Sequence, residues 1–197
     1  MDVSVNRLQE VLTGKNYLFF DKQKPYNLNI IGIRSNTTVS NAFDDHLYLI
    51  YRDDSLNLLS HRFAVTTDPG AHWLKNPLNV NGTAILVPGQ YRGSHQIGLH
   101  RKTYEALVQK APVKVWRDND KDDHIDTGGK IYEGIFGINI HRSNAQGESQ
   151  VVEKWSAGCT VFKKVADFNF FMDICRKARN LYGNSFTYTL LEEKDFS

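Results

Sequence analysis

The sequence predicts a mainly β protein of the α+β class, built as a β-sandwich or barrel with a long C-terminal helix and a final strand. Short apolar runs recur between turn signals, which is typical of sandwiches and barrels. One long helical period, at residues 165–180, precedes the last alternating run. The 197 residues suffice for one core and show no linker-like segment, so we predict a single domain over 1–197 with a short N-terminal extension of about residues 1–25.

The first third of the chain predicts one short helix followed by strands. Residues 4–13 place Leu8, Val11 and Leu12 on one face of an amphipathic helix, and Gly14 ends it. Apolar, β-branched or alternating runs then predict strands at residues 26–33, 46–51 and 58–67. A strong turn signal, Asp68-Pro69-Gly70, closes the last of these runs.

The middle of the chain mixes short strands with loops. Residues 73–82 contain Asn-Pro and Asn-Gly pairs and are expected to form a loop. Residues 103–110 are expected to form a short helix, with Tyr104, Leu107 and Val108 facing inward. Two further strands are predicted, at residues 83–87 and 113–116.

An acid-rich segment at residues 118–126 has acids at alternate positions, which supply hard oxygen ligands in calcium loops. The EF-hand pattern fails, however, because Asp123 stands where glycine is required and Gly129 where a bidentate glutamate is required. We therefore expect a solvated hairpin loop between strands at 113–116 and 131–141. Since the other histidines lack ligand spacing, we expect no metal and no cofactor.

The C-terminal part gives the clearest helical pattern. Residues 165–180 place Phe168 and Cys175 on a broad apolar face, and Gly183 is expected to end the helix. Cys175 is therefore interpreted as a core residue. The alternation at 185–191 predicts the final strand.

Composition and charge exclude several classes of function. The chain is 41% hydrophobic and 23% charged, as soluble globular proteins are, and its net charge of +2 is scattered, so nucleic acid is not expected as a partner. No apolar run approaches the roughly 20 residues of a membrane span, and no signal peptide is recognisable. Two cysteines make no disulfide framework. We expect a monomer without membrane insertion.

Chemistry-bearing residues concentrate between positions 137 and 162. His141 ends an apolar run, with Asn139 on the same face of the predicted strand. After a polar loop, Cys159 follows eighteen residues later, behind the small-residue turn Ser156-Ala157-Gly158. A hairpin-like return would place the thiol beside the imidazole, and an imidazole neighbour increases the thiolate fraction of a cysteine.

This pattern resembles the catalytic domain of the L,D-transpeptidases, the YkuD-like superfamily, in the form of a divergent branch. In that family a histidine is followed, after a stretch of about this length, by Ser or Thr, any residue, Gly and Cys. His141, Ser156, Gly158 and Cys159 match in order and spacing. A Pro-Gly pair ahead of an aromatic, within a β-hairpin, is an upstream family feature, and the segment from Leu86 to Tyr91 looks like a shortened version.

The resemblance implies a cysteine acyl-enzyme that acts on peptidoglycan stem peptides, as an L,D-peptidase or an L,D-transpeptidase. Cys159 would be the nucleophile and His141 the base. The backbone carbonyl of Arg142 would hold the imidazole tautomer, and backbone N–H groups near Gly158 and Cys159 would stabilise the oxyanion. Substrate contacts would come from four residues: Trp155, Ser156, Tyr91 and Asn139.

Two positions depart from the family pattern. Ala157 stands where the family usually has His, and Val161 stands where it has Asn or Arg. These departures motivate a second hypothesis, a catalytically inactive wall-binding or phage structural module with the same fold. A cysteine protease acting on proteins is a third. We expect synthesis in the cytoplasm and action at the cell wall or periplasm after delivery, or a phage-encoded protein.

Overall fold

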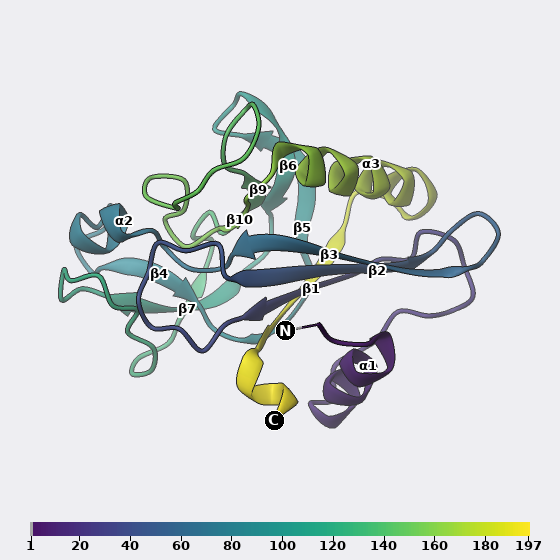
Figure 1. The fold of residues 1–197 in the computed structure, drawn as a ribbon, viewed down its shortest axis with the longest axis horizontal. Coiled ribbons are helices and arrows are strands. Elements are labelled where there is room, and N and C mark those ends of the chain that lie inside the picture. The colour runs from purple at the N-terminus through teal and green to yellow at the C-terminus, as the bar shows by residue number, and fades with distance from the viewer. Residues whose placement is uncertain (1) are drawn as a thin grey trace.

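Eight strands close into a barrel in the computed structural model, which describes residues 2–197 (Figure 1). These strands are β1 (Asn29–Arg34), β2 (Asp45–Arg52), β3 (Leu58–Thr66), β5 (Gly89–His100), β6 (Tyr104–Gln109), β9 (Ile140–Arg142), β10 (Thr160–Phe162) and β11 (Phe186–Glu192). Around the barrel they follow the order β1-β11-β5-β6-β9-β10-β3-β2. Most neighbours are antiparallel, but β1 runs parallel to β11 and β9 runs parallel to β10. The prediction of a mainly β, barrel-forming chain is confirmed.

A second, smaller sheet lies at one end of the molecule, at the left of Figure 1. Its three strands are β4 (Thr83–Leu86), β7 (Val113–Asp118) and β8 (Tyr132–Gly134), in that order. The short helix α2 (Ala71–Lys75) packs on this sheet, since Leu74 forms a buried cluster with Ile85 and Ile125. The small sheet therefore has its own apolar contacts beside the barrel.

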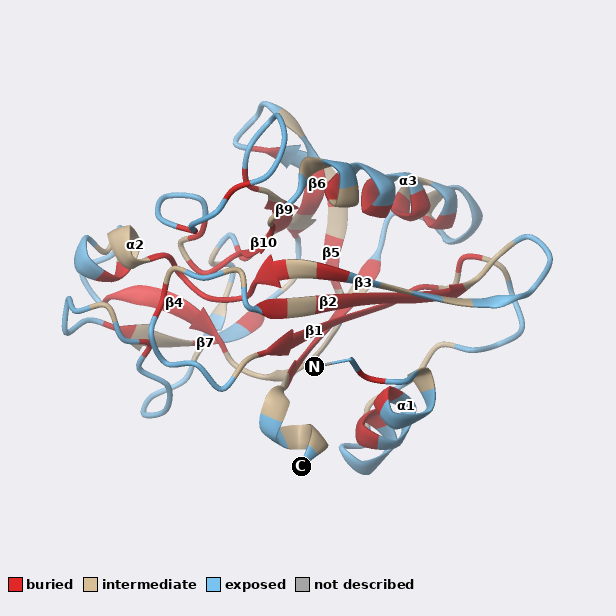
Figure 2. Ribbon diagram, in the orientation of Figure 1, coloured by how far each residue is buried: buried red, intermediate tan, exposed pale blue. Residues whose placement is uncertain are grey.

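Helix α3 (Val165–Tyr182) shares the main hydrophobic core with the barrel interior. Phe168, Phe171 and Cys175 are buried on one face of the helix, and Figure 2 shows its opposite face exposed. The ring of Phe162 on β10 lies 5.1 Å from that of Phe171 and 5.7 Å from that of Phe168. Gly183 ends the helix with a φ of 86°. The predicted helix, its buried face and its end are confirmed.

The N-terminal helix α1 (Val5–Gly14) covers an outer face of the barrel. Leu8 and Leu12 are buried there with Ile31 of β1. The closing 3-10 helix η1 (Glu193–Phe196) lies next to α1 and adds Phe196 to the same cluster. The predicted extension is thus a packed part of the structure.

The helix predicted at residues 103–110 is wrong, because this segment is strand β6. The spacing of Tyr104, Leu107 and Val108 fits one face of a helix. In the fold, β6 instead pairs with β5 in an unbroken antiparallel register and meets β9 at Leu107. Pairing with two neighbours inside a closed barrel outweighs a short helical spacing.

Three other boundaries differ from the sequence prediction. Strand β5 was not predicted, because its glycines interrupt the alternation of apolar and polar residues. Its register with β11 is irregular around Gly93, which has a φ of 60°. The segment 73–82 is not all loop, because α2 extends to Lys75. The strand predicted at 131–141 is two short strands, β8 and β9, joined by an irregular segment.

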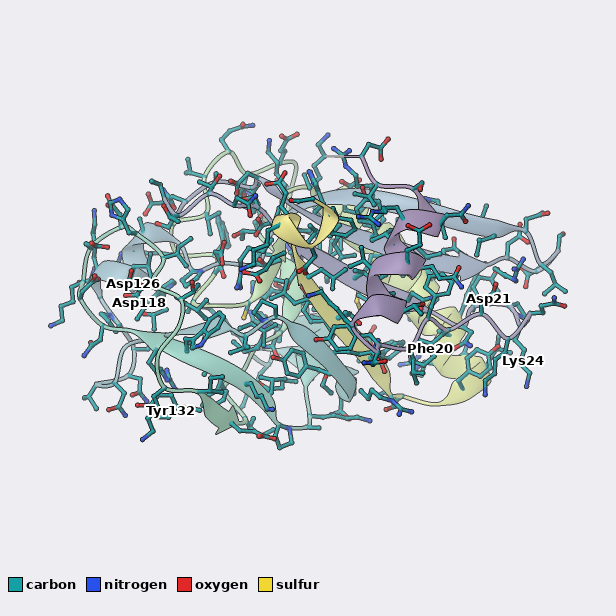
Figure 3. All side chains as sticks on the ribbon, turned by 90° about the horizontal axis from the view of Figure 1, so that it is seen from below. Phe20, Asp21, Lys24, Asp118, Asp126 and Tyr132 are labelled. Atoms are coloured by element: carbon teal, nitrogen blue, oxygen red, sulfur yellow. The ribbon has the colours of Figure 1, made fainter. Side chains whose placement is uncertain are left out.

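The acid-rich segment 118–126 lies in the connection between β7 and β8, which pair antiparallel as predicted. Asp118 and Asp126 lie side by side (Figure 3), and the carboxylate of Asp118 accepts the N–H of Asp126 at 2.9 Å. Asp123 forms a 3.2 Å ion pair with Lys75. Backbone turns and a local ion pair therefore account for the shape of this connection.

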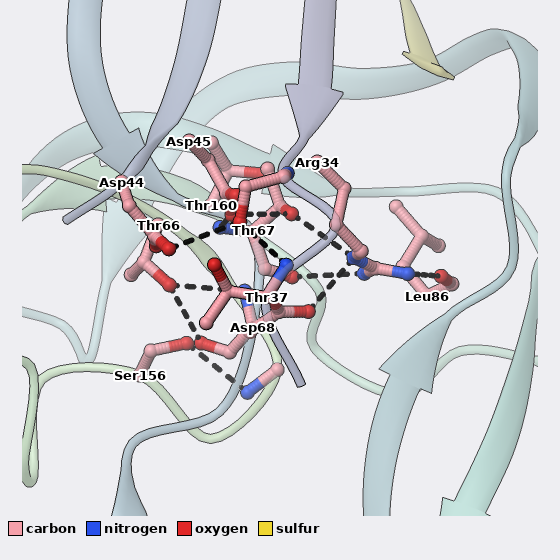
Figure 4. Close-up of polar contacts among 12 residues, drawn as sticks. Arg34, Thr37, Asp44, Asp45, Thr66, Thr67, Asp68, Leu86, Ser156 and Thr160 are labelled. Atoms are coloured by element: carbon pink, nitrogen blue, oxygen red, sulfur yellow. Dashed lines mark hydrogen bonds and ion pairs between the residues drawn. The ribbon is translucent and has the colours of Figure 1, made fainter. Parts of the chain in front are cut away.

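A buried charged cluster lies at the end of β1 (Figure 4). Arg34 forms a 2.7 Å ion pair with Asp68 and donates to the carbonyl oxygens of Thr67 and Leu86 at 3.1 and 2.9 Å. Asp45 accepts the N–H of Thr67 at 2.6 Å. Burial and the neighbouring charge of Asp68 raise the pKa of Asp45 to about 7. One guanidinium thus balances two buried carboxyl groups.

Neither cysteine takes part in a disulfide, and Cys175 is fully buried, as expected of a core residue. In residues 2–197 no helix is both long and apolar enough to cross a membrane.

Candidate active site

The hairpin-like return expected between His141 and Cys159 is wrong, because β9 and β10 pair in parallel and a hairpin joins antiparallel strands. The parallel pairing still places the two residues on neighbouring segments. His141 pairs with Val161, and Ile140 pairs with Thr160, so Cys159 comes just before β10 and beside Asn139. The N–H of Thr160 donates to the carbonyl oxygen of Asn139 at 2.9 Å and extends this pairing. Cys159 lies two residues before Val161, and side chains two residues apart on an extended segment share a face. Because Val161 is the partner of His141, Cys159 and His141 face the same side of the sheet.

Hydrogen bonds hold the turn before Cys159. The hydroxyl of Ser156 donates to the carbonyl oxygen of Cys159 at 2.8 Å and accepts the N–H of Gly158 at 3.2 Å. The N–H of Gly70 donates to the carbonyl oxygen of Ser156 at 2.9 Å, which ties the turn to the charged cluster drawn in Figure 4. Ser156 is fully buried, so it supports the turn and is not available to a substrate.

Gly158 is required at its position for two reasons. Its φ of 110° is unfavourable for any residue with a Cβ, and a Cβ there would overlap the carbonyl oxygen of Ala84 on β4. The turn therefore packs directly against the small sheet. This contact fixes the position of Cys159 relative to the small sheet.

Replacing Gly158 with alanine is expected to lower stability by more than about 1 kcal/mol and to displace Cys159, with at least a roughly tenfold loss of activity. The matched control is Gly147→Ala, because Gly147 also has a positive φ of 72° but has open space around its Cβ position. The control should show the conformational cost without the loss of activity. Equal activity losses in the two variants would contradict this role of Gly158.

The imidazole of His141 is held in one tautomer. Its Nδ1 lies 2.8 Å from the carbonyl oxygen of Arg142, which only accepts hydrogen bonds, so Nδ1 carries the proton and Nε2 is the free basic nitrogen. The hydroxyl of Tyr104 donates to the same carbonyl oxygen at 3.2 Å. The ring of His100 stacks on His141, with 4.0 Å between centroids and 22° between planes. The contact implied for the Arg142 carbonyl is present.

The sulfur of Cys159 has its own partners. It accepts the N–H of Asn139 at 3.4 Å and donates to the carbonyl oxygen of Gly137 at 3.3 Å. The side-chain amide of Asn139 also meets Nδ1 of His100 at 3.1 Å, which connects the thiol to the stacked histidines. Among the hydrogen bonds within residues 2–197, none joins the sulfur directly to His141.

Burial sets the protonation state of both groups. It raises the pKa of Cys159 to about 11, against the opposing effects of the Asn139 N–H and the charge of Arg101. Burial, together with His100, lowers the pKa of His141 to about 3. At neutral pH the resting site therefore holds a thiol and a neutral imidazole. Burial outweighs the increase in thiolate fraction that a neighbouring imidazole can give.

The raised pKa predicts slow alkylation of Cys159 by iodoacetamide near neutral pH. Because the thiolate is the reactive form, the rate should still rise about tenfold per pH unit between pH 9 and 10, where a free cysteine with a pKa of about 8.5 levels off. Subtracting the rate of Cys159→Ala removes any contribution from Cys175. A rate that reaches a plateau below pH 8 would contradict the neutral resting thiol.

A cleft of about 440 Å³ opens above the sulfur, between the barrel and the small sheet. It is lined by both members of the dyad and by Asn139 and Trp155, two of the residues expected to contact substrate. A second hollow of about 360 Å³ adjoins it on the other side of His141, and His100, Arg101, His141 and Trp155 line both. Tyr91 lies apart from both, beside Pro88 and Lys114.

Comparisons with protein-family models, with curated proteins and with solved structures gave no match. The assignment of a function to this cleft therefore depends on its own geometry and on the sequence motif.

Three residues that line the cleft were not predicted from the sequence: His100, Arg101 and Arg117. His100 ends β5, the strand that the sequence pattern did not reveal, and Arg117 belongs to β7 in the separate small sheet. Their convergence on Cys159 depends on tertiary structure, since no local spacing connects them. The one available signal was a histidine followed directly by two basic residues at an element boundary.

Proposed function

We propose that the protein is a cysteine-dependent acyl-enzyme that acts on peptidoglycan stem peptides, as an L,D-peptidase or L,D-transpeptidase. The observation that carries this proposal is the hydrogen bond from His141 to the carbonyl of Arg142, in a cleft that also contains Cys159. That bond leaves Nε2 free to accept a proton. We also propose that the barrel is a divergent form of the L,D-transpeptidase fold, acting at the cell wall after delivery or encoded by a phage.

In the first half-reaction the Cys159 sulfur forms a bond to the peptide carbonyl carbon while its proton moves to Nε2 of His141. The tetrahedral intermediate then collapses, the C–N bond breaks, and the imidazolium gives its proton to the leaving amine. The product is an acyl-thioester on Cys159. Because the resting groups are neutral, proton transfer accompanies the attack on the carbonyl instead of preceding it.

In the second half-reaction water or an amine attacks the thioester. His141 accepts the proton of the attacking group, and the C–S bond breaks to restore the thiol. His141 lines both the cleft and the second hollow, so an acceptor in either one lies beside the imidazole. Hydrolysis and transfer share all these residues.

Of the two N–H groups expected to stabilise the oxyanion, at Gly158 and Cys159, one is the better candidate. The N–H of Gly158 already donates to the Ser156 hydroxyl, so it is occupied in the resting structure. Within residues 2–197 the N–H of Cys159 has no comparable acceptor. We therefore assign the oxyanion to the Cys159 N–H, with Gly158 shaping the turn that aims it.

A second candidate is an inactive module that binds the cell wall or forms part of a phage particle. The hydrogen bonds of the sulfur to Gly137 and Asn139 favour it, because they satisfy the thiol without the imidazole. Ala157 and Val161, which replace the family's usual residues, point the same way, and Val161 is buried in β10.

Incubation with purified muropeptides separates these candidates. Mass spectrometry of the products should show loss of a stem residue or of a cross-bridge for hydrolysis, or a mass gain by amine exchange for transfer. The Cys159→Ala protein should leave every muropeptide unchanged. If the wild-type protein also leaves all of them unchanged while retaining the native fold, the inactive module is the better account.

A further inference from the structure

Seven lysine and arginine side chains in residues 2–197 are buried or half-buried, and five of them are paired with carboxylates. The paired ones are Arg34, Arg52, Lys163, Arg176 and Arg179. The other two are Arg117 and Arg142, which have no ion pair within the described chain. Both of them line the hollows that flank Cys159 and His141.

The two unpaired guanidinium groups are held in similar ways. Arg117 lies over the ring of Phe136, 5.1 Å from its centroid, and donates to the carbonyl oxygen of Gly82 at 2.9 Å. Arg142 lies over the ring of Tyr104 at 4.2 Å. Stacking on an aromatic face fixes the plane of a guanidinium and leaves N–H groups at its edge for a ligand.

The two hollows differ in which guanidinium they contain. Arg117 lines the hollow with Cys159, while Arg142 lines the one beyond His141. The exposed Arg101 lines both, at the turn between β5 and β6. Neither hollow is lined by an aspartate or a glutamate. Positive charge therefore accumulates on both sides of the dyad with no protein carboxylate to balance it.

Desolvation makes this arrangement unfavourable without an anion. Partial burial lowers the pKa of Arg117, since the charged form loses hydration. Half-buried charges are ordinarily paired, as the other five are here. A carboxylate is the group that matches the planar fork of a guanidinium and accepts two hydrogen bonds from it.

We propose that the two hollows form one groove for an acidic peptide, with a carboxylate bound by Arg117 on one side of the scissile bond and a second bound by Arg142 on the other. Arg101 adds attraction at the shared rim. This inference rests on the proposed function, because it takes the acidic peptide to be the substrate. Arg117 and Arg142 select the substrate, and His141 and Cys159 react with it.

Binding to the Cys159→Ala protein tests the groove without turnover. The probes are a disaccharide-tetrapeptide muropeptide with free carboxylates and the same muropeptide with its carboxylates amidated. Calorimetry should give a Kd at least roughly tenfold weaker for the amidated probe. Arg117→Gln and Arg142→Gln, added singly, should each weaken the free-carboxylate probe by a similar factor and hardly change the amidated one. Circular dichroism checks that each variant folds.

Arg92→Gln is the matched control, because Arg92 is exposed on β5 and lies outside both hollows. It should leave both Kd values unchanged. Equal affinity for the two probes, or equal losses for both in the arginine variants, would overturn the carboxylate groove. Wild-type turnover of muropeptides with such charge-independent binding would overturn only this inference. Carboxylate-dependent binding without wild-type turnover would support the groove and overturn the proposed reaction.

Discussion

Replacing His141 with alanine is expected to slow the turnover of peptidoglycan stem peptides by roughly 10⁴- to 10⁶-fold, about as much as replacing Cys159. The reason is the neutral resting pair. With the thiol pKa raised to about 11, almost no thiolate exists at pH 7 unless a base takes the proton during the attack. The Arg142 carbonyl holds the proton on Nδ1 of His141, which leaves Nε2 as the basic nitrogen for that task.

The double variant makes this prediction sharper. Because a nucleophile and its base act as a unit, Cys159→Ala combined with His141→Ala should be no slower than either single variant. His72→Ala is the matched control, since His72 on α2 lines neither hollow, and it should retain wild-type activity. Rate losses that multiply in the double variant would show that the two residues act separately. Thermal unfolding of each variant excludes a general loss of fold.

Replacing Arg34 with methionine is expected to destabilise the protein by about 3–5 kcal/mol. The change removes the ion pair to Asp68 and the hydrogen bonds to the Thr67 and Leu86 carbonyls, and it leaves two buried carboxyl groups without their cation. Urea denaturation measures the loss. Arg52→Met is the control, because Arg52 pairs with Asp21 nearer the surface, and it should destabilise the protein much less than Arg34→Met.

The loss of stability caused by Arg34→Met is expected to depend on pH. The pKa of Asp45 is raised from 3.8 to about 7 in the folded state, so folding is favoured where this carboxyl is protonated and loses that advantage as pH rises from about 4 to about 7. Without Arg34 the pKa of Asp45 and that of Asp68 should rise further. The destabilisation by Arg34→Met should therefore be larger at pH 8 than at pH 4. A penalty that shrinks as pH rises would contradict the electrostatic account.

Elements with one dominant local pattern were predictable from the sequence. Helix α3 follows from the apolar face that includes Phe168 and Cys175, and Gly183 marks its end. Strands β2 and β3 follow from β-branched or alternating runs bounded by turn residues. These patterns reflect burial on one face, which the sequence carries directly.

Strands β5 and β6 were not predictable in the same way. Glycines interrupt the first, and the second has the apolar spacing of a short helix. What decides both is their pairing with each other and with β9 and β11 in the closed barrel. Such pairing joins segments far apart in the chain, and local spacing does not encode it.

In the candidate site, too, some features were predictable from local sequence and others depend on tertiary structure. His141 and Cys159 were predictable as candidates from the motif, but the parallel pairing of their segments was not. The stacking of His100 on His141 and the approach of Arg117 from another sheet were not, since both depend on how the barrel and small sheet meet. The raised pKa of Cys159 was missed for the same reason, because burial is a tertiary property.

Rapid-quench intact-mass spectrometry tests the central claim most directly. The protein is mixed with muropeptide, samples are quenched with acid at times from milliseconds to minutes, and the intact mass of the protein is measured. We predict a transient mass increase equal to the acyl part of the stem peptide, mapped by digestion to Cys159 and absent from Cys159→Ala. Product formation without any adduct at any quench time, or turnover by Cys159→Ala at the wild-type rate, would contradict it.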